Sequence, residues 1–432
     1  MSFKETEVGR IPIDWEVDEL SNKVDLVMGQ SPKSEFYNDK GIGMPFMQGR
    51  TTFGEKYHYI NTWCTDIKRV GIKNSVLMSV RAPVGDVNIA TEDICIGRGL
   101  ASLNMKNKNN EFLYYLLKNY SGLLISKESG TVFGSINKAG IEKLVLPFPS
   151  NSEQKAIAKI LSDLDEKIEI NNKINKNLEE MAQAIFKQWF VDFEFPNEEG
   201  KPYKSSGGEM VESELGMIPK GFKVKSIGEL PLIITDYVAN GSFKSLKENV
   251  NMYDEINYAI IVRNTDLKSN FKSDCKYVDK KSYDFLAKSK LFGGELIISN
   301  VGDVGSIYLC PKFKKQMTLG SNLIMIDTES SENIGFNLIL YRFFKSYIGQ
   351  YYIKSITGGS AQPKFNKTDF KKIQFINPSN SILKLYNEKN EVIESIIMNN
   401  VLENERLEKL RDTLLPKLMS GEIRVCLENS EN

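Results

Sequence analysis

The residues that could hydrolyse a phosphodiester lie in one short stretch. Asp192 is followed by Glu199-Gly200-Lys201, an order similar to the Asp…Glu-x-Lys set with which some nucleases hold a divalent metal ion. In those nucleases the groups lie on paired strands, whereas here they fall in a polar segment rich in Gly, Ser and Pro, residues 191–210. We therefore interpret them as part of a solvated linker, with nuclease chemistry as the alternative.

Residues for other enzyme chemistry are absent from the sequence. There is no GxxxxGK[ST] loop to hold a nucleotide, and the nearest approach to an amino-methyltransferase motif is Asn377-Pro378-Ser379, without the second proline and the aromatic residue. His58 is the single histidine, which argues against multi-histidine metal sites and triads. The cysteines are scattered and predict neither zinc nor disulfides (Cys64, Cys95, Cys275, Cys310, Cys426). We expect a non-catalytic chain that binds no cofactor or metal itself.

Side chains that could read DNA are present in both halves of the chain. Arg, Lys, Asn, Gln and Ser can contact base edges, and they gather here near glycines that let a backbone approach. The candidates of the first half are Gln30, Ser31, Lys33, Gln48, Arg50, Arg81 and Lys138. Those of the second half are Lys244, Arg263, Asn264, Gln362, Lys364 and Lys367. For each one the alternative is a solvated turn residue, and the bases recognised do not follow from the sequence.

The two halves repeat one another. ETEVGRIPIDWEV (residues 5–17) returns as ESELGMIPKGFKV (residues 212–224), and the glycine loop SGTVFGSINK (residues 129–138) corresponds to TGGSAQPKFNK (residues 357–367). RAPVGDV and NVGDVGSI, which begin at Arg81 and Asn300, look like equivalent turns between strands. The period is too long for a solenoid and indicates a duplicated domain, which suits a target that is read at two places.

A long helix follows each globular half. Apolar residues recur every three or four positions from Ser152 to Phe190, a span of ~58 Å as a helix, and again from Ser381 to Leu418. Pro416 is expected to kink or end the second helix near Leu415. We predict an antiparallel coiled coil with a polar layer that fixes its register; solvated flank positions are the alternative for these residues (Asn171, Asn175, Asn400, Asn404).

Short β-rich runs bounded by Gly, Pro and Asn alternate with helical patches in each half, for example residues 75–80, 111–118, 295–300 and 336–346. The expected fold class is α+β: two similar domains joined by two long helices with a pseudo-two-fold relation. The expected segments are 1–150 (first domain), 151–195 (central helical spacer), 196–210 (linker), 211–380 (second domain) and 381–432 (C-terminal helical spacer).

Charge is distributed unevenly although the whole chain has a net charge of +0. Lys and Arg exceed Asp and Glu in residues 1–150 and 206–380, whereas acidic residues are in excess in the helical stretches. This segregation permits a DNA partner without requiring one. No apolar run is long enough for a membrane span, and MSFKETEVGR lacks the apolar core of a signal peptide. We expect a cytoplasmic protein without a membrane partner.

The ends of the two helices carry a family resemblance. FKQWFVDFEFP (residues 186–196) and LRDTLLPKLMSGEIRV (residues 410–425) resemble the central and C-terminal conserved regions of type I restriction–modification specificity (S) subunits. EQKAIAKILSDLDEKIEINN (residues 153–172) is similar to the start of the central region, and GSAQPKFNK (residues 359–367) to the loop that closes a recognition domain. The first loop departs from this pattern because it has no Gln-Pro.

The resemblance implies two target recognition domains that each read one half of a bipartite, asymmetric site in double-stranded DNA. It implies that the helices space the domains and dock two methyltransferase (M) subunits, which supply S-adenosylmethionine, while restriction (R) subunits supply chemistry driven by ATP and Mg²⁺. We expect apolar side chains at the helix ends to dock the M subunits, with a closed local core as the alternative (Trp189, Phe190, Phe193, Leu414, Leu415, Leu418).

Overall fold

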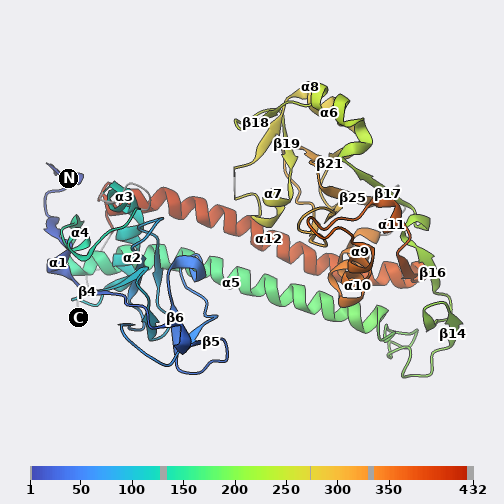
Figure 1. Ribbon diagram of the computed structural model, residues 1–432, viewed down its shortest axis with the longest axis horizontal. Coiled ribbons are helices and arrows are strands. Elements are labelled where there is room, and N and C mark those ends of the chain that lie inside the picture. The colour runs from blue at the N-terminus through green and yellow to red at the C-terminus, as the bar shows by residue number, and fades with distance from the viewer. Residues whose placement is uncertain (1, 127–133, 273, 329–334, 426–432) are drawn as a thin grey trace. The chain divides into compact units, whose positions relative to one another are not determined.

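The computed structural model describes residues 2–126, 134–272, 274–328 and 335–425, so residues 129–133 of the first glycine loop and Cys426 lie outside the described residues. It contains two compact units. Unit 1 comprises residues 1–173 and 399–432, and unit 2 comprises residues 174–398. The long helices α5 (Asn151–Phe190) and α12 (Asn380–Met419) each contribute one half to each unit (Figure 1).

Unit 1 contains two main sheets within its described residues. The first has the order β10-β9-β12-β4, with β10 (Val87–Ile89), β9 (Val76–Ser79), β12 (Leu100–Met105) and β4 (Val24–Met28). The second has the order β5-β7-β6-β11-β8, with β5 (Tyr37–Asn38), β7 (Trp63–Cys64), β6 (Met44–Met47), β11 (Ile94–Ile96) and β8 (Val70–Gly71). The remaining elements are β1 (Phe3–Thr6), β2 (Gly9–Pro12), β3 (Glu16–Glu19), β13 (Val145–Phe148), α1 (Leu20–Lys23), α2 (Asn110–Asn119), α3 (Ser121–Ser126) and α4 (Lys138–Glu142).

Unit 2 repeats this plan. Its first sheet has the order β17-β25-β22-β23, with β17 (Leu232–Asp236), β25 (Leu323–Thr328), β22 (Leu296–Ser299) and β23 (Ile307–Leu309). Its second has the order β18-β20-β19-β24-β21, with β18 (Met252–Tyr253), β20 (Lys276–Val278), β19 (Ala259–Val262), β24 (Gln316–Leu319) and β21 (Lys290–Leu291). The remaining elements are β14 (Met210–Ser213), β15 (Gly216–Pro219), β16 (Lys223–Ser226), β26 (Gln374–Asn377), α6 (Phe243–Asn249), α7 (Asn264–Lys268), α8 (Lys280–Phe285), α9 (Phe336–Lys345), α10 (Tyr347–Ile356) and α11 (Lys367–Lys371).

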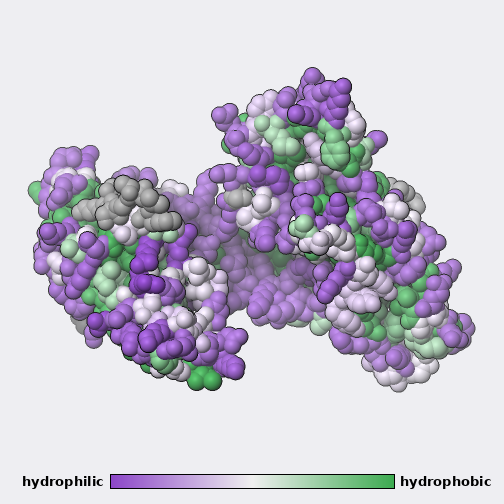
Figure 2. Space-filling model, in the orientation of Figure 1, coloured by the Kyte–Doolittle hydropathy of each residue, from purple (hydrophilic) through white to green (hydrophobic). Residues whose placement is uncertain are grey.

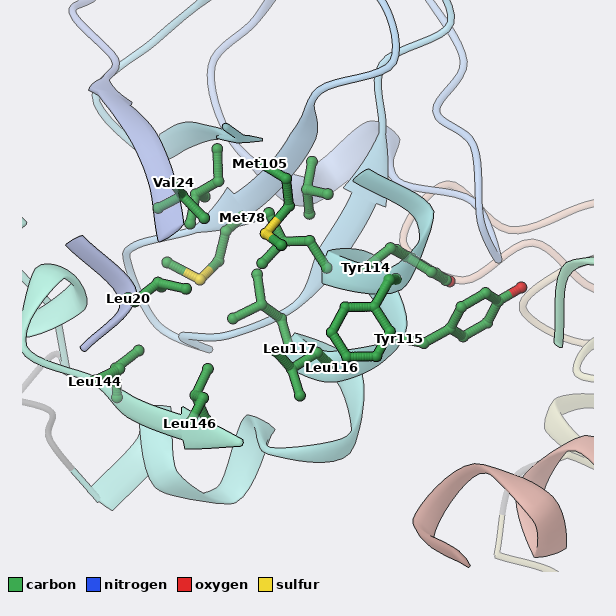
Figure 3. Close-up of a cluster of buried hydrophobic side chains, with 14 of the residues drawn as sticks. Leu20, Val24, Met78, Met105, Tyr114, Tyr115, Leu116, Leu117, Leu144 and Leu146 are labelled. Atoms are coloured by element: carbon green, nitrogen blue, oxygen red, sulfur yellow. The ribbon is translucent and has the colours of Figure 1, made fainter. Parts of the chain in front are cut away.

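Strand β9 of the first sheet is buried on both faces because each face is covered. Successive side chains of a strand point to opposite faces. In β9, Val76 and Met78 pack in the cluster that contains α2, whereas Leu77 packs toward the second sheet. Figure 3 shows Met78, Met105 and Val24 on the sheet, with Leu116 and Leu117 of α2 in the same cluster. Unit 2 repeats this alternation in β22. The expected strands at residues 75–80 and 295–300 and the α+β class are confirmed.

The long helices pair in antiparallel fashion within each unit. In unit 1, Asp165 contacts Arg411, whereas the later Asn171 contacts the earlier Asn404. Asn171 Nδ2 donates to Asn404 Oδ1 at 2.9 Å, and Asn404 Nδ2 donates to Asn172 Oδ1 at 2.9 Å. In unit 2, Asn175 Nδ2 lies 3.4 Å from the carbonyl oxygen of Ile397. Asn171 and Asn404 thus form a buried polar layer, and the role of the four asparagines in fixing the register stays a prediction.

The structure distinguishes between the alternatives at the helix ends. The second helix does not end near Leu415 but includes Pro416 and continues to Met419. The apolar side chains at the ends are not an exposed cluster, because they belong to the hydrophobic cores of their units; all are buried except Leu414, which is partly buried (Trp189, Phe190, Phe193, Leu414, Leu415, Leu418). The closed local core, the alternative, therefore describes them.

Each globular part is attached to the helices through one buried charged residue, Asp165 in unit 1 and Arg342 in unit 2. In unit 1, Asp165 of α5 accepts hydrogen bonds from Tyr115 Oη of α2 (2.6 Å) and Arg411 Nη1 of α12 (2.8 Å). In unit 2, Arg342 of α9 pairs with both Glu179 of α5 and Glu394 of α12. A buried carboxylate is costly without such a partner, so these contacts fix each globular part on its section of the helix pair.

Replacing Arg411 should strongly destabilise the protein. Arg411→Met leaves the Asp165 carboxylate buried without a cation, and we expect the free energy of unfolding to fall by about 3–5 kcal/mol. Chemical denaturation measures this. The additional substitution Asp165→Asn should restore part of the loss. Lys159→Ala, which removes an exposed ion pair with Asp163, is the control and should leave stability unchanged; an equally small effect of Arg411→Met would contradict the anchoring role.

Stability should depend on pH through His58. Burial lowers the pKa of this imidazole below its ordinary value, so the folded state favours the neutral form. On acidification the unfolded chain takes up the proton first, at about pH 6.5, and the contribution of His58 to stability then falls until the lower folded-state pKa is passed. As the pH is lowered from about 7.5 to 5.5, the free energy of unfolding of the wild type should therefore fall relative to that of His58→Gln. A difference independent of pH would refute this.

Candidate nucleic-acid interface

Two polar loops meet in the same way in both units. In unit 1 the loop after β9 forms a bridge between Arg81 and Ser135, and Ile136 N donates to the carbonyl oxygen of Val80 at 3.1 Å. In unit 2 the corresponding loop forms a bridge between Val301 and Lys364, and Phe365 N donates to the carbonyl oxygen of Asn300 at 3.1 Å. The loops that the sequence repeat related to one another therefore have equivalent positions.

Each of these bridges carries one exposed cation. In unit 1 it is Arg81, from the loop after the strand, whereas in unit 2 it is Lys364, from the closing segment. The same place in the fold thus presents a positive charge from opposite strands of the bridge. A charge in this position suits a phosphate or the edge of a base.

A second polar group lies at the carboxyl ends of the parallel strands β6 and β11 of unit 1. Arg98 N donates to Ser31 Oγ at 3.1 Å, and Ser31 Oγ donates to Gln48 Oε1 at 2.9 Å. Gly97 and Gly99 make room for this contact, since a Cβ on Gly97 would lie 2.7 Å from Gln48 Oε1 and one on Gly99 2.6 Å from the Gln48 carbonyl oxygen. Gln48 and Arg98 are exposed. The structure therefore holds an ordered amide at the surface.

Unit 2 has a charged group in the corresponding place. Arg263 follows β19, which pairs in parallel with β24. Its Nε and Nη2 donate to the carboxylate of Asp266 at 2.9 and 2.6 Å, and Nη2 also donates to the Asp274 carbonyl oxygen at 2.8 Å. The pKa of Arg263 is raised by its hydrogen bond to Asp266. The next residue, Asn264, points its amide toward Asp303 at 3.4 Å.

The remaining predicted DNA-binding residues are more dispersed. Gln30 donates its backbone N–H to Ile96, Arg50 pairs with Asp86, and Gln362 is exposed in the closing loop. The lysines lie in separate places: Lys33 beside Glu35, Lys138 beside Glu142, Lys367 beside Asp236, and Lys244 exposed on α6. Ser31 with Gln48, and the neighbours Arg263 and Asn264, form groups close to the ends of the parallel strands.

Several exposed side chains near these loops did not stand out in the sequence. Hollows of about 610 and 480 Å³ lie on unit 2 beside the loop that follows β22. The first contains Phe243, which is 83% exposed, and the second contains Tyr347 (71%) and Tyr351 (69%). Arg98 of unit 1 was also missed, although its position between two glycines in Ile96–Leu100 is a signal of the kind used for the other candidates.

The residues suspected of nuclease chemistry are paired and exposed. Lys201 Nζ lies 2.9 Å from Glu199, and Lys187 Nζ lies 2.6 Å from Asp192. Across the described residues, no group of three or more His, Cys, Asp or Glu side chains could hold a metal ion, and no helix is long and apolar enough to cross a membrane. Hydrophilic residues dominate the face shown in Figure 2.

Comparison with known proteins agrees with this arrangement. A family model for the type I restriction modification DNA specificity domain matches residues 12–180. The type I restriction enzyme MjaIX specificity subunit of Methanocaldococcus jannaschii is 29% identical, over 98% of this chain and 96% of that protein. The MjaX specificity subunit of the same organism is 43% identical, but the match covers 43% of this chain and only 44% of that protein.

A solved structure shares the fold. The S subunit of a type I restriction-modification system from M. genitalium aligns with a TM-score of 0.57 at 18% identity, over 94% of this chain and 96% of that chain. The sequence matches make this chain similar to type I restriction–modification specificity subunits, and the solved structure shares its fold.

Gly97→Ala should disturb the order of Gln48. The added methyl group would lie 2.9 Å from Gln48 Cα, which cannot move without the backbone. We expect a loss of about 1–3 kcal/mol in the free energy of unfolding, as is typical of overpacking. Gly122→Ala in α3 is the control, because a Cβ there meets nothing within 4 Å. Equal stability of the two variants in denaturant titrations would show that the close approach at Gly97 is not required.

Proposed function

We propose that this chain is the DNA-reading subunit of a type I restriction–modification complex and that it recognises a bipartite, asymmetric site. Residues 1–150 and 211–380 act as the two target recognition domains. The main support is that both units place equivalent loops at equivalent strand ends but equip them with different side chains. Gln48 of unit 1 corresponds to Arg263 of unit 2, and the bridge cation changes from Arg81 to Lys364. Different side chains at equivalent backbone positions suit the recognition of two different half-sites.

In this proposal the chain carries no catalytic activity. Two methyltransferase subunits bind S-adenosylmethionine and modify the DNA, and restriction subunits use ATP and Mg²⁺. The helical segments 151–195 and 381–432 space the recognition domains, residues 196–210 link the first helix to the second domain, and the complex acts in the cytoplasm. The name of the MjaIX relative, a specificity subunit that matches along almost the whole chain, supports this role.

Two other functions can be separated from this one by experiment. A nuclease built on Asp192, Glu199 and Lys201 would nick plasmid DNA when the purified chain is given Mg²⁺. A scaffold that binds only proteins would not shift a random-sequence duplex at low salt, whereas a DNA reader binds it with an affinity that falls as salt rises. The ion pairs of Lys201 with Glu199 and of Lys187 with Asp192 give no support to the nuclease.

The two half-sites should be specified independently. Cells that contain this chain and its cognate methyltransferase subunit should show one bipartite methylated motif on methylome sequencing. Replacing residues 1–150 by the first domain of another family member should change one half of that motif and leave the other half intact, because unit 2 keeps its own loops. An exchange of unrelated surface residues is the control. If both halves changed together, independent reading would be excluded.

A further inference from the structure

We propose that Gln48 and Arg263 are the equivalent base-reading positions of the two domains, and that Gln48 reads an adenine while Arg263 reads a guanine. This inference rests on the proposed function and adds to it the base that each side chain selects. It follows from the hydrogen-bonding capacity that the fold leaves to each side chain.

The two positions are equivalent in the backbone. Gln48 is the first residue after β6, which pairs in parallel with β11, and Arg263 is the first residue after β19, which pairs in parallel with β24. In unit 1, Gly97 N donates to the carbonyl oxygen of Met47 at 2.7 Å; in unit 2, Gly320 N donates to that of Val262 at 2.8 Å. Each side chain therefore leaves the sheet at the same place, next to a glycine of the neighbouring loop.

The surroundings of Gln48 fix the direction of its amide group. Ser31 Oγ accepts a hydrogen bond from Arg98 N and donates its own proton to Gln48 Oε1. The carbonyl end of the amide thus faces Ser31, and Oε1 keeps a second lone pair while Nε2 keeps its donors. One donor beside one acceptor matches N7 and N6 of adenine, the pair that glutamine typically reads in the major groove.

Arg263 offers only donors. Its guanidinium is held by Asp266, whose side chain is fully buried, so its orientation is set by the core of unit 2. The bonds to Asp266 occupy Nε and one side of Nη2, and the bond to the Asp274 carbonyl oxygen occupies the other side of Nη2. Among the described residues no acceptor is bonded to Nη1, and Nη2 can exchange the carbonyl of the exposed Asp274 for a base. Two donors match O6 and N7 of guanine.

Neighbouring side chains fit these roles less well. Arg50 lies two residues after Gln48, but it is paired with Asp86. Asn264, next to Arg263, has its amide directed at Asp303. Arg81 and Lys364 belong to different strands of the bridge, which suits a contact to phosphate more than an equivalent readout of bases. Gln48 and Arg263 combine equivalent backbone positions with an orientation that other protein groups hold in place.

The test exchanges the chemistry of one position for that of the other. The full chain with its cognate methyltransferase subunit is used to select duplexes from libraries in which one half-site is randomised, and methylation is read by sequencing. Gln48→Arg should convert one A·T pair of the first half-site, other than the methylated pair, to G·C and leave the second half-site unchanged. Ser31→Ala should lower the preference for adenine at that same pair roughly tenfold to hundredfold.

Matched variants separate the possible results. Arg263→Lys should relax the choice of guanine in the second half-site only, and Gln188→Arg, the same change as at Gln48 but at an exposed position of α5, should leave both half-sites unchanged. Selection by binding reports base preference even where methylation is lost. An unchanged preference in Gln48→Arg or Arg263→Lys, or a change in the opposite half-site, would overturn the inference alone. A wild-type complex without a bipartite motif would overturn the proposed function as well.

Discussion

One carboxylate on each long helix, the buried Asp165 of α5 and the half-buried Glu394 of α12, is the constraint on which the rest of the structure depends. Asp165 and Glu394 occupy equivalent positions in the two helices. Each meets the helix that covers the first sheet of its unit, α2 or α9, and each needs a positive charge because a carboxylate cannot be buried alone without a large cost. The charge comes from Arg411 of the partner helix in unit 1 and from Arg342 of α9 in unit 2. Burial raises the pKa of Glu394, and the nearby arginine opposes that effect.

The attachment by charged hydrogen bonds has a geometric consequence. Apolar contacts between a helix and a globular part can shift by part of a turn at little cost, whereas a bond from Tyr115 to one oxygen of Asp165 and from Arg411 to the other allows one arrangement. The start of α5 is fixed to unit 1 in a similar way, because Glu153 accepts hydrogen bonds from Trp15 and Arg424. In unit 2 the residue that corresponds to Trp15 is Phe222, and it stacks on Phe195. The two units thus reach the same attachment with different chemistry.

The sequence predicted those parts of the fold that depend on local pattern. The short β-rich runs at β9 and β22 predicted strands, and the repeat related the loops that are equivalent in the structure. Contacts between distant residues were not predictable, since nothing local to Gln48 indicates that Ser31 and Arg98 will hold its amide. The burial of Trp189 and Leu418 remained one of two alternatives, because the residues that cover them, such as Tyr386 beside Trp189 and Trp15 in the cluster of Leu418, are distant in the sequence. Pro416 lies in the last turn of α12, where a proline removes one hydrogen bond and not a whole helix.

The residues that attach each globular part to the helices are separate from the exposed loop residues proposed to contact DNA. This separation explains how one fold can serve two different half-sites. The anchoring residues are buried, so most substitutions there lower stability and are constrained in both units. Gln48, Arg98, Arg81 and Lys364 are exposed at loop ends, where substitutions change the free energy of unfolding little. Arg263 is an intermediate case, because Asp266 beneath it is buried and would lose its cation. Base preference can therefore change more freely at the Gln48 position than at the Arg263 position, where Arg263 and Asp266 must change together.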